Sequence, residues 1–473
     1  MASEASIRDL RRLVVGTEEQ VALLDGSTRT YVHFDNASST PFLQSVLDRI
    51  VEFAPMYASV GRGSGYKSHV STEAFERARA TIGRFVGASP DTHTVILGKN
   101  TTEALNKLAH CLRFSKDDVI LTSRMEHHSN ELPWRRTATV HHIGLRDDGS
   151  LDVSQLSDLL GRFGGRVRLV SITGASNVTG FVNPIHEIAR IVHDAGALLA
   201  VDAAQLAPHR TIDVGRPDDL RRIDFLTYTG HKMYAPLGIG ALVALKDAIQ
   251  AAEPDLVGGG TVDFVTEEEV VWSELPAREE AGTPNIVGAI GWAQAIETLT
   301  EIGMDRIARH EAELTEALLH AMRQRGDVEV FGDAEPARAG NRLGVVTFRV
   351  ADVDHRLTTA ILGFEGGIGV RAGLFCAHPY VQKLIGMPSE VSQRILRELR
   401  CGEHPDVPGL IRASFGIYNT PAEVDWFVEM LDRVRHGEYE GEYRWDPTTR
   451  SFGSDETAGG AAVDAAWSSR FCT

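Results

Sequence analysis

The stretch VRLVSITGASNVTGFVNPIHEIARIVHDAGALLAVD, residues 167–202, carries two apolar runs on either side of one amphipathic segment. The runs 167–173 and 197–202 are mostly continuous rather than alternating, which is typical of parallel strands buried on both faces. Between them, apolar side chains recur at the spacing of one helix face, at Ile185, Ile188, Ala189 and Val192. The stretch therefore predicts a strand–helix–strand unit of a parallel sheet.

The same alternation extends in both directions, over residues 90–250. Further β-rich runs are TVILG (94–98), DVILTS (118–123), IDFLTYT (223–229) and IGALVAL (239–245), and TEALNKLAHCL is helical in pattern. Strands that alternate with helices predict an α/β fold with a mostly parallel central sheet flanked by helices. We expect this large domain to span residues 31–290.

A different pattern follows. Residues 285–325 predict two long helices, and the β-rich runs VEVF, RLGVVTFRV, GIGVRAG and LIRASFGIY come after them with helices between. We expect a smaller α+β C-terminal domain over 291–437, with the N-terminal segment 1–30 packed against it. Residues 438–473 lose periodicity and gain Gly, Ser, Thr and Ala, so they are expected to form a partly disordered tail.

Composition narrows the class of protein. The chain has 473 residues, 43% of them hydrophobic, and its 48 basic and 65 acidic residues give a formal charge of −17. An acidic chain of this kind argues against a nucleic-acid partner, and no apolar run reaches the roughly 18 residues of a membrane helix. The first 20 residues lack a signal or transit pattern. Four irregularly spaced cysteines predict no disulfide framework, so a cytoplasmic location is expected.

Polar side chains follow five of the predicted strands. In open parallel sheets, ligands bind outside the carboxyl ends of the strands, so these side chains are expected to share one rim. The rim comprises Thr101, Thr102, Glu126, His127, His128, Asn177, Asp202, Gln205, Thr229, His231 and Lys232.

Lys232 is the residue on this rim that most needs an explanation. It is either a surface lysine with a buried stem or an amine held for chemistry, and Asp202 is either a helix N-cap or a buried carboxylate with a partner. An amine, a carboxylate and hydroxyls on one rim match pyridoxal 5′-phosphate, which needs a Schiff-base lysine, a partner for its ring nitrogen and donors to its phosphate.

At these residues the chain resembles the class V aminotransferase family of fold-type I pyridoxal-phosphate enzymes, and most closely its cysteine desulfurase and selenocysteine lyase branch. The resemblance spans about residues 30 to 437. It is carried, in the family's order, by FDNASSTP (34–41), NTTEALN (100–106), MEHHSN (125–130), SNVTG (176–180), VDAAQ (201–205), TGHKMYAPLGIG (229–240), EAGTPN (280–285), VRAGLFCAHP (370–379) and RASFGIYNT (412–420).

The resemblance implies a role for each rim residue toward the cofactor. Lys232 would form the Schiff base, with its pKa lowered by burial. Asp202 would hold the ring nitrogen, His127 would stack on the ring and relay a proton, and Gln205 and Asn177 would contact the ring hydroxyl and the substrate side. The implied phosphate contacts are Thr101, Thr102, Thr229 and His231.

Thr283 corresponds to a residue that reaches the phosphate of a neighbouring subunit in the family. The resemblance therefore implies a homodimer with shared active sites. The alternative is that Thr283 belongs to a turn ahead of a helix that begins with Pro284.

The residues on the substrate side of the implied site determine which reaction the resemblance predicts. The resemblance assigns Arg371 to the substrate carboxylate, with Ala37 and Asn177 nearby. It makes Cys376 the thiolate that takes sulfur from a cysteine-type amino acid, which leaves a persulfide for a sulfur-acceptor protein. Because Leu374 and Phe375 flank it, Cys376 is alternatively a buried structural thiol.

A metal site at Glu126, His127 and His128 was the competing interpretation of the second rim segment. Adjacent histidines can bind zinc, but no matching third and fourth ligands stand at helical spacing, so we expect no metal.

The reaction itself stays open at this stage. The chain departs from the desulfurase pattern at residues 374–375, and its segment 380–411 is longer than in compact desulfurases. The alternatives are another pyridoxal-phosphate reaction with Cys376 as a bystander (C–S lysis of a modified cysteine, epimerisation or transamination) and a non-catalytic sulfur-relay protein of the same fold.

Overall fold

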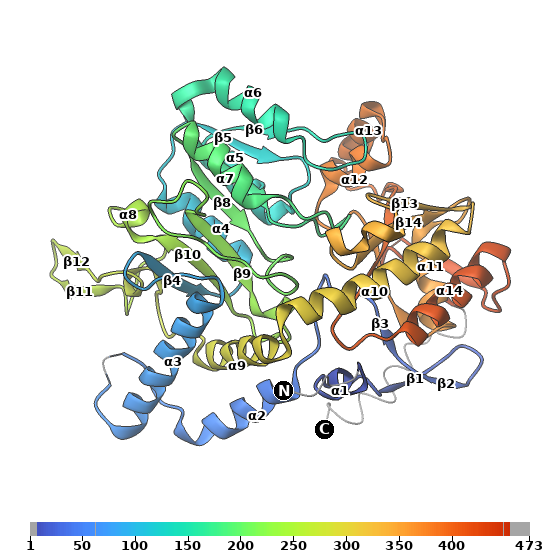
Figure 1. Ribbon diagram of the computed structural model, residues 1–473, viewed down its shortest axis with the longest axis horizontal. Helices are drawn as coiled ribbons and strands as arrows, with labels where there is room; N and C mark the ends of the chain where they lie inside the picture. The colour runs from blue at the N-terminus through green and yellow to red at the C-terminus, as the bar shows by residue number, and fades with distance from the viewer. Residues whose placement is uncertain (1–6, 62, 448, 455–473) are drawn as a thin grey trace.

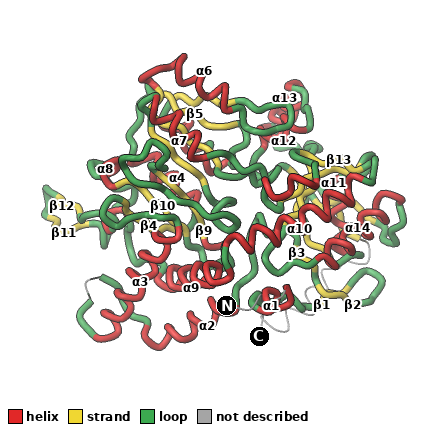
Figure 2. The backbone as a smooth tube through the Cα atoms, in the orientation of Figure 1, coloured by secondary structure: helices red, strands yellow, loops and turns green. Residues whose placement is uncertain are grey.

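The computed structural model describes residues 7–61, 63–447 and 449–454. Two β-sheets, each with its own helices, form the two halves of the molecule seen in Figure 1, and the long helix α10 (Met304–Arg323) extends from the larger half to the smaller one. Figure 2 shows the strands gathered into these two groups with helices around each group. The predicted α/β architecture is confirmed.

The larger sheet has seven strands in the order β4-β10-β9-β8-β7-β5-β6. Strand β10 is antiparallel to both of its neighbours, and β9, β8, β7, β5 and β6 pair in parallel. The strands are β4 (His93–Gly98), β5 (Val119–Ser123), β6 (Thr139–Ile143), β7 (Val167–Thr173), β8 (Leu198–Asp202), β9 (Phe225–Thr229) and β10 (Gly240–Leu245).

The six predicted runs correspond to six of these strands. Central strands β5 and β9 are buried along their whole length, which explains why their sequences are apolar without alternation. The seventh strand, β6, was not predicted. It lies at the edge of the sheet, is mostly half-buried and contains His141 and His142, so it lacks the apolar run of a central strand.

Helices cover both faces of this sheet. In α7 the buried residues Ile185, Ile188, Ala189 and Val192 are the four that the helical spacing predicts. The helices of this half are α2 (Gln44–Phe53), α3 (Tyr66–Phe85), α4 (Thr101–Cys111), α5 (Leu132–Thr137), α6 (Val153–Phe163), α7 (Ile185–Asp194) and α8 (Lys246–Ile249).

The two long helices predicted over 285–325 are confirmed as α9 (Ile286–Ile302) and α10 (Met304–Arg323). Helix α9 packs against α2 and α3 of the larger half, and α10 contacts α14 (Pro421–His436) of the smaller half. Gly303 separates the two helices with a φ of 92°, a left-handed conformation that favours glycine.

The smaller sheet has four strands in the order β13-β14-β17-β16. Its core joins α10, the sheet and α14 through residues such as Phe348, Ile411 and Phe427. Its remaining elements are β13 (Val328–Phe331), β14 (Val345–Val350), β16 (Arg371–Gly373), β17 (Leu410–Ser414), α11 (His355–Phe364), α12 (His378–Leu384) and α13 (Ser389–Arg400).

The N-terminal part of the chain reaches this smaller half. Strand β3 (Val32–His33) pairs in parallel with β15 (Ile368–Gly369), and Leu24 N–H donates to Phe364 O at 2.9 Å. The other elements of this part are α1 (Ile7–Arg12), β1 (Gln20–Ala22) and β2 (Thr28–Thr30). This pairing carries the following segment, residues 34–41, toward the carboxyl end of the large sheet.

Besides the antiparallel pair β1–β2, two hairpins lie outside the main sheets. Strands β11 (Val262–Val265) and β12 (Val270–Trp272) project from the large half (Figure 1). Strands β18 (Tyr443–Asp446) and β19 (Ser451–Ser454) lie within the predicted tail, and residues 455–473 of that tail are outside the described residues. Among the described helices, none combines the length and hydropathy needed to cross a membrane.

Candidate active site

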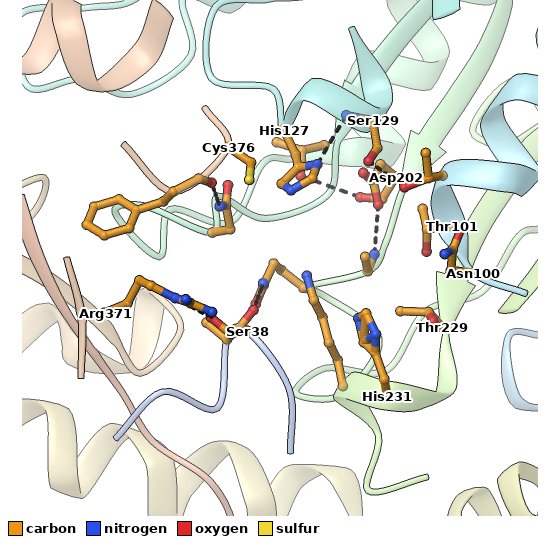
Figure 3. Close-up of a pocket in the computed structure, with 18 of the residues that line it drawn as sticks. Ser38, Asn100, Thr101, His127, Ser129, Asp202, Thr229, His231, Arg371 and Cys376 are labelled. Atoms are coloured by element: carbon orange, nitrogen blue, oxygen red, sulfur yellow. Dashed lines mark hydrogen bonds between the residues drawn. The ribbon is translucent and has the colours of Figure 1, made fainter. Parts of the chain in front are cut away.

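A cavity of about 500 Å³ lies where the carboxyl ends of the large sheet face the smaller sheet. Its walls include the ends of β8 and β9, the start of α4, the N-terminal segment around Ala37, and residues of β16 and β17. Figure 3 shows Thr101, Thr229 and His231 toward one end of the cavity and Arg371 and Cys376 toward the other. We call these the ring end and the substrate end.

The start of α4 forms one wall of the ring end. Asn100 caps this helix by accepting a hydrogen bond from Glu103 N–H at 3.0 Å, and the helix start lines the cavity at Asn100, Thr101 and Thr102. The buried Thr101 Oγ1 has no protein partner among the described residues. Thr102 lies beside it, and its Oγ1 is 2.7 Å from Ser129 Oγ. The helix start therefore offers donors to an anion.

The end of β9 and the turn after it complete the ring end. Thr229 Oγ1 donates a hydrogen bond to Ile239 O at 3.0 Å. The Thr229 side chain lines the cavity, where the lone pairs of its oxygen can still accept a hydrogen bond. Burial, together with the nearby Lys232 charge, lowers the pKa of His231 to about 4, so its ring is neutral near pH 7. The buried His231 Nε2 lacks a partner within the described part of the chain, as Thr101 Oγ1 does.

Lys232 closes the short 3-10 turn Gly230–Lys232 that follows β9. Burial lowers the pKa of its amine to about 8, although the Asp202 carboxylate opposes this change. A lysine with this pKa carries a substantial fraction of free amine near neutral pH, which is the form that reacts with an aldehyde.

Asp202 ends β8 and is 5% exposed. Its Oδ1 accepts a hydrogen bond from Ala204 N–H at 2.9 Å, and burial raises its pKa while that N–H and Lys232 lower it. A carboxylate in this position is costly unless a cationic partner meets it. Asp202 and Lys232 line the same cavity.

His127 lies between β5 and the turn His128–Asn130. Burial, and then the charges of Lys232 and its other neighbours, lower the pKa of His127 to about 3. Ser129 N–H donates to its Nδ1 at 3.1 Å, so the proton of the neutral ring is on Nε2 (Figure 3). His127 is therefore a neutral ring on the cavity wall, with its N–H donor at Nε2.

The side chains on either side of His127 in the sequence, Glu126 and His128, contact other parts of the protein. Glu126 accepts hydrogen bonds from Asn130 Nδ2 and Thr173 N–H at 2.7 and 2.9 Å, and burial raises its pKa to about 8. His128 instead contacts the turn around Cys376. The three side chains that raised the question of a metal thus serve three separate sets of contacts.

Two amide side chains connect the ring end to other segments. Gln205 Nε2 donates to Ala37 O at 2.7 Å, and Asn177 Nδ2 donates to Phe375 O at 2.8 Å. Both amides line the cavity. They therefore bind the N-terminal segment and the Cys376 turn to the carboxyl ends of the large sheet.

Two arginines lie at the substrate end, and the sequence reasoning singled out only one. Arg371 contacts Asp35 at 3.2 Å and its side chain is 53% exposed. Arg412, from β17, contacts the same carboxylate at 2.9 Å and is 3% exposed. Its buried Nε has no partner among the described residues. Arg412 donates from Nη2 to Ser38 Oγ at 2.7 Å.

Arg412 had a signal in the sequence. It is the one charged residue in the run LIRASF, and a charge inside a buried strand requires a partner or a function. Asp35 and Ser38 were also missed, since FDNASSTP contributed only Ala37 to the predicted site. Their importance follows from contacts with residues more than 300 positions away.

Cys376 is exposed and lines the cavity. The alternative of a buried structural thiol is therefore wrong, although its neighbours Leu374 and Phe375 are buried, 9% and 8% exposed. The exposed thiol lies in the same cavity as Lys232 and both arginines.

Thr283 is exposed in a bend three residues before α9 and is not among the described residues that line the cavity of its own chain. Its predicted contact with a second subunit stays a prediction.

The cavity fits a cofactor with an anionic group and a cationic ring. Within residues 7–454 as described, Thr101 Oγ1 and His231 Nε2 are unpaired at the ring end, and Arg412 Nε is unpaired at the substrate end. Asp202 supplies the buried carboxylate and Lys232 the amine. The sheet and the site together define an α/β enzyme with a lysine-and-carboxylate cofactor site.

The chain belongs to the class V aminotransferase family: the profile described as Aminotransferase class-V matches residues 32–427. Members of this family are pyridoxal-phosphate enzymes. This membership confirms the family resemblance that the sequence motifs indicated.

Named relatives agree with this assignment. A cysteine desulfurase of Haloferax volcanii is 33% identical over 444 residues, which cover 92% of this chain and 96% of the relative. A probable cysteine desulfurase of Streptomyces coelicolor is 34% identical over 418 residues, covering 86% and 92%.

Solved structures show the same fold. The apo structure of a cysteine desulfurase from Thermococcus onnurineus superposes with a TM-score of 0.79 at 31% identity, covering 92% of this chain and 100% of that one. The cysteine desulfurase CsdA (S-sulfonic acid) from Escherichia coli gives a TM-score of 0.75 at 28% identity, covering 91% and 99%.

Proposed function

We propose that this protein is a pyridoxal-phosphate-dependent cysteine desulfurase or selenocysteine lyase, in which Cys376 accepts the sulfur or selenium atom. The observation that carries the proposal is the joint lining of one cavity by Lys232, Asp202 and an exposed Cys376. Desulfurase relatives at 33–34% identity over most of the chain support it.

The ring-end residues would hold the cofactor. Thr101, Thr102, Thr229 and His231, with the N-terminus of α4, would hold the phosphate, and Asp202 would hold the ring nitrogen. His127 would cover one face of the ring, and Gln205 would donate to the ring hydroxyl. When bound, pyridoxal phosphate supplies an electron sink that allows bonds at the substrate's α-carbon and β-carbon to be broken.

The substrate-end residues would bind and orient the amino acid. The guanidinium groups of Arg371 and Arg412 would hold its carboxylate, where the unpaired Arg412 Nε supplies a free donor. Lys232 moves protons at its Nζ, since its pKa of about 8 suits both directions of transfer near neutral pH.

The Cys376 thiolate would then attack the substrate sulfur. The carbon–sulfur bond breaks, its electron pair stays with the carbon, which is protonated, and a sulfur–sulfur bond forms at Cys376. Cysteine plus the enzyme thiol thus yields alanine plus an enzyme persulfide. A second thiol, which we infer belongs to an acceptor protein, must take that sulfur. Reduced thiols persist in the cytoplasm, which is where we expect the protein to work.

The test is product analysis with free cysteine. The parent enzyme should release alanine and, with a reductant, sulfide, while Cys376→Ala should bind cysteine with a spectral change and release neither. Cys401→Ala is the matched control, because Cys401 is also an exposed free cysteine. If Cys376→Ala keeps parental turnover on free cysteine, the proposed role of Cys376 is wrong.

A second candidate function is C–S lysis of an S-substituted cysteine, with Cys376 as a bystander. It is favoured by a second cavity of about 880 Å³ behind the Cys376 turn, whose lining shares Ala372 and His378 with the site. Turnover of an S-substituted cysteine that survives Cys376→Ala, together with negligible turnover of free cysteine, would select this candidate.

We also infer a homodimer in which Thr283 of one subunit contacts the cofactor phosphate held by the other. Two separately inactive variants, Lys232→Ala and Thr283→Asp, test this. Hybrid dimers would contain one site with both native residues, so mixing after mild dissociation should restore about a quarter of parental activity. Absence of any recovery in verified hybrid dimers would contradict shared sites.

A further inference from the structure

The turn that carries Cys376 has a backbone that ordinary residues avoid. Phe375 and Cys376 have φ angles of 50° and 53°. Successive non-glycine residues in the left-handed region are disfavoured, because each side chain crowds its own backbone. Such a conformation persists only where surrounding contacts hold it.

Two segments hold this turn from outside. On one side, Asn177 Nδ2 donates to Phe375 O at 2.8 Å. On the other side, His128 N–H donates to Cys376 O at 2.7 Å. His378 N–H donates to His128 Nε2 at 3.3 Å, and the two imidazole rings meet edge to face at a centroid distance of 4.5 Å.

His128 therefore contacts the turn twice, through its backbone at Cys376 and through its side chain at His378. Burial lowers the pKa of His128, which keeps the ring neutral near pH 7 and lets Nε2 accept the hydrogen bond. His128 also directly follows His127, whose ring lines the cavity. One short segment thus contacts both the cofactor side of the cavity and the turn that presents the thiol.

We propose that His128 is a positioning residue that holds the Cys376 thiol in place for sulfur transfer by fastening the left-handed turn at Cys376 and His378. The inference rests on the proposed desulfurase function. Substrate binding uses Arg371 and Arg412 on other elements, so loss of the His128 side chain slows sulfur transfer and leaves cysteine binding nearly unchanged.

The experiment compares three variants of the full-length, cofactor-loaded enzyme. His128→Leu removes the acceptor, His128→Gln keeps an acceptor at similar reach, and His404→Leu is the control. His404, like His128, lines the second cavity of about 880 Å³, but its ring contacts Arg450 at 3.0 Å. For each variant, kcat and KM for cysteine are measured, with the single-turnover yield of persulfide at Cys376 by mass spectrometry.

We expect kcat and the rate of persulfide formation to fall about tenfold in His128→Leu, with KM and the cofactor absorbance unchanged. His128→Gln should stay within about threefold of the parent, and His404→Leu should match it. A purely structural role would lower cofactor content or folded yield without this separation of kcat from KM.

Two results would overturn the proposal: parental kcat in His128→Leu, or a His128→Gln variant as slow as His128→Leu. If His128→Leu does not fold, His128→Asn replaces it, because its shorter side chain cannot reach the His378 N–H, and the same two results apply. If the parent enzyme forms no persulfide at Cys376, the proposed desulfurase function itself is wrong. If the parent enzyme forms the persulfide and His128→Leu is as active as the parent, only the proposed role of His128 is wrong.

Discussion

The two ends of the cavity are built in different ways. At the ring end, Asp202 ends β8, Thr229 ends β9 and Lys232 closes the turn after β9, so neighbouring parallel strands place these groups near one another. At the substrate end, Arg371 and Arg412 come from the smaller sheet, and Asp35 comes from the N-terminal segment. One end is a product of a single sheet, and the other is assembled from distant parts of the chain.

The groups that would serve the cofactor's chemistry therefore lie on a different part of the fold from the groups that would select the substrate. The proposed cofactor site needs fixed relative positions for an amine, a carboxylate and a phosphate cradle, and buried parallel strands hold such groups in place. The substrate end depends on contacts between separately folded segments, where a change in one loop alters shape without disturbing the cofactor groups. We therefore expect substitutions at the ring end to abolish activity and those at the substrate end to change it by degree.

The largest effect is expected at Lys232. Lys232→Ala should lose activity by a factor of roughly 10³ or more, since the amine that we propose bonds the cofactor and moves protons is gone. After borohydride reduction, the parent should carry cofactor covalently and the variant should not, as measured by intact mass. Lys99→Ala, an exposed lysine two residues from Thr101, is the control. Cofactor fixed covalently to the Lys232→Ala chain would contradict the assignment.

The next effect concerns the carboxylate at the ring end. Asp202→Ala should lower kcat by roughly 10²- to 10³-fold while the fold is kept, because the buried carboxylate that we propose pairs with the cofactor's ring nitrogen is lost. Circular dichroism and cofactor content check the fold, and steady-state kinetics check the activity. Activity within a few-fold of the parent would show that the reaction does not depend on an Asp202 contact with the cofactor's ring nitrogen.

The substrate end offers a graded test, because its two arginines differ in burial. Arg412 is 3% exposed and Arg371 53% exposed. Removing the buried charge leaves Asp35 without one of its partners, so Arg412→Ala should raise KM for cysteine by roughly 30-fold or more. Arg371→Ala should raise it only a few-fold, as for exposed ion pairs. Equal effects of the two substitutions would show that burial does not set their contributions.

The smallest effect is a pH dependence at Lys232. Its pKa of about 8 means that, in the cofactor-free protein, the free amine increases as pH rises through 8. Labelling of Lys232 by an amine reagent, followed by mass spectrometry, should therefore reach half its maximum near pH 8 rather than near the value of about 10.4 for a free lysine. In Asp202→Asn the midpoint should move lower, since the negative charge that favours the ammonium form is removed. A midpoint that moves upward would contradict this coupling.

Much of the fold followed from short-range patterns. The helical spacing in residues 184–196 predicted which four residues of α7 are buried, and six continuous apolar runs predicted six strands of the large sheet. Strand β6 escaped because an edge strand with half-buried histidines shows neither continuous apolarity nor alternation. The hairpin β18–β19 escaped because each strand is only four residues long, so the alternation of Tyr443 and Trp445 with charged residues is too short to stand out in a polar segment.

The candidate site divides in the same way. Polar residues that directly follow strands, such as Asp202 and Lys232, were predicted because the carboxyl ends of parallel strands share one edge. Arg412 and Asp35 were not, since their meeting across 377 residues is invisible to any local pattern. Cys376 was found by its motif, but whether its thiol is exposed depended on the packing of Leu374 and Phe375 around it.

By itself, the sequence determined the α/β architecture through hydrophobic periodicity, the family through its ordered motifs, and the grouping of the ring-end residues through the shared edge of parallel strands. Only the tertiary structure decided the substrate end: which arginine is buried, how Asp35 joins the two, and how His128 and Asn177 hold the left-handed turn of Cys376. These features depend on how segments hundreds of residues apart pack together, and burial and hydrogen-bond partners exist only after that packing.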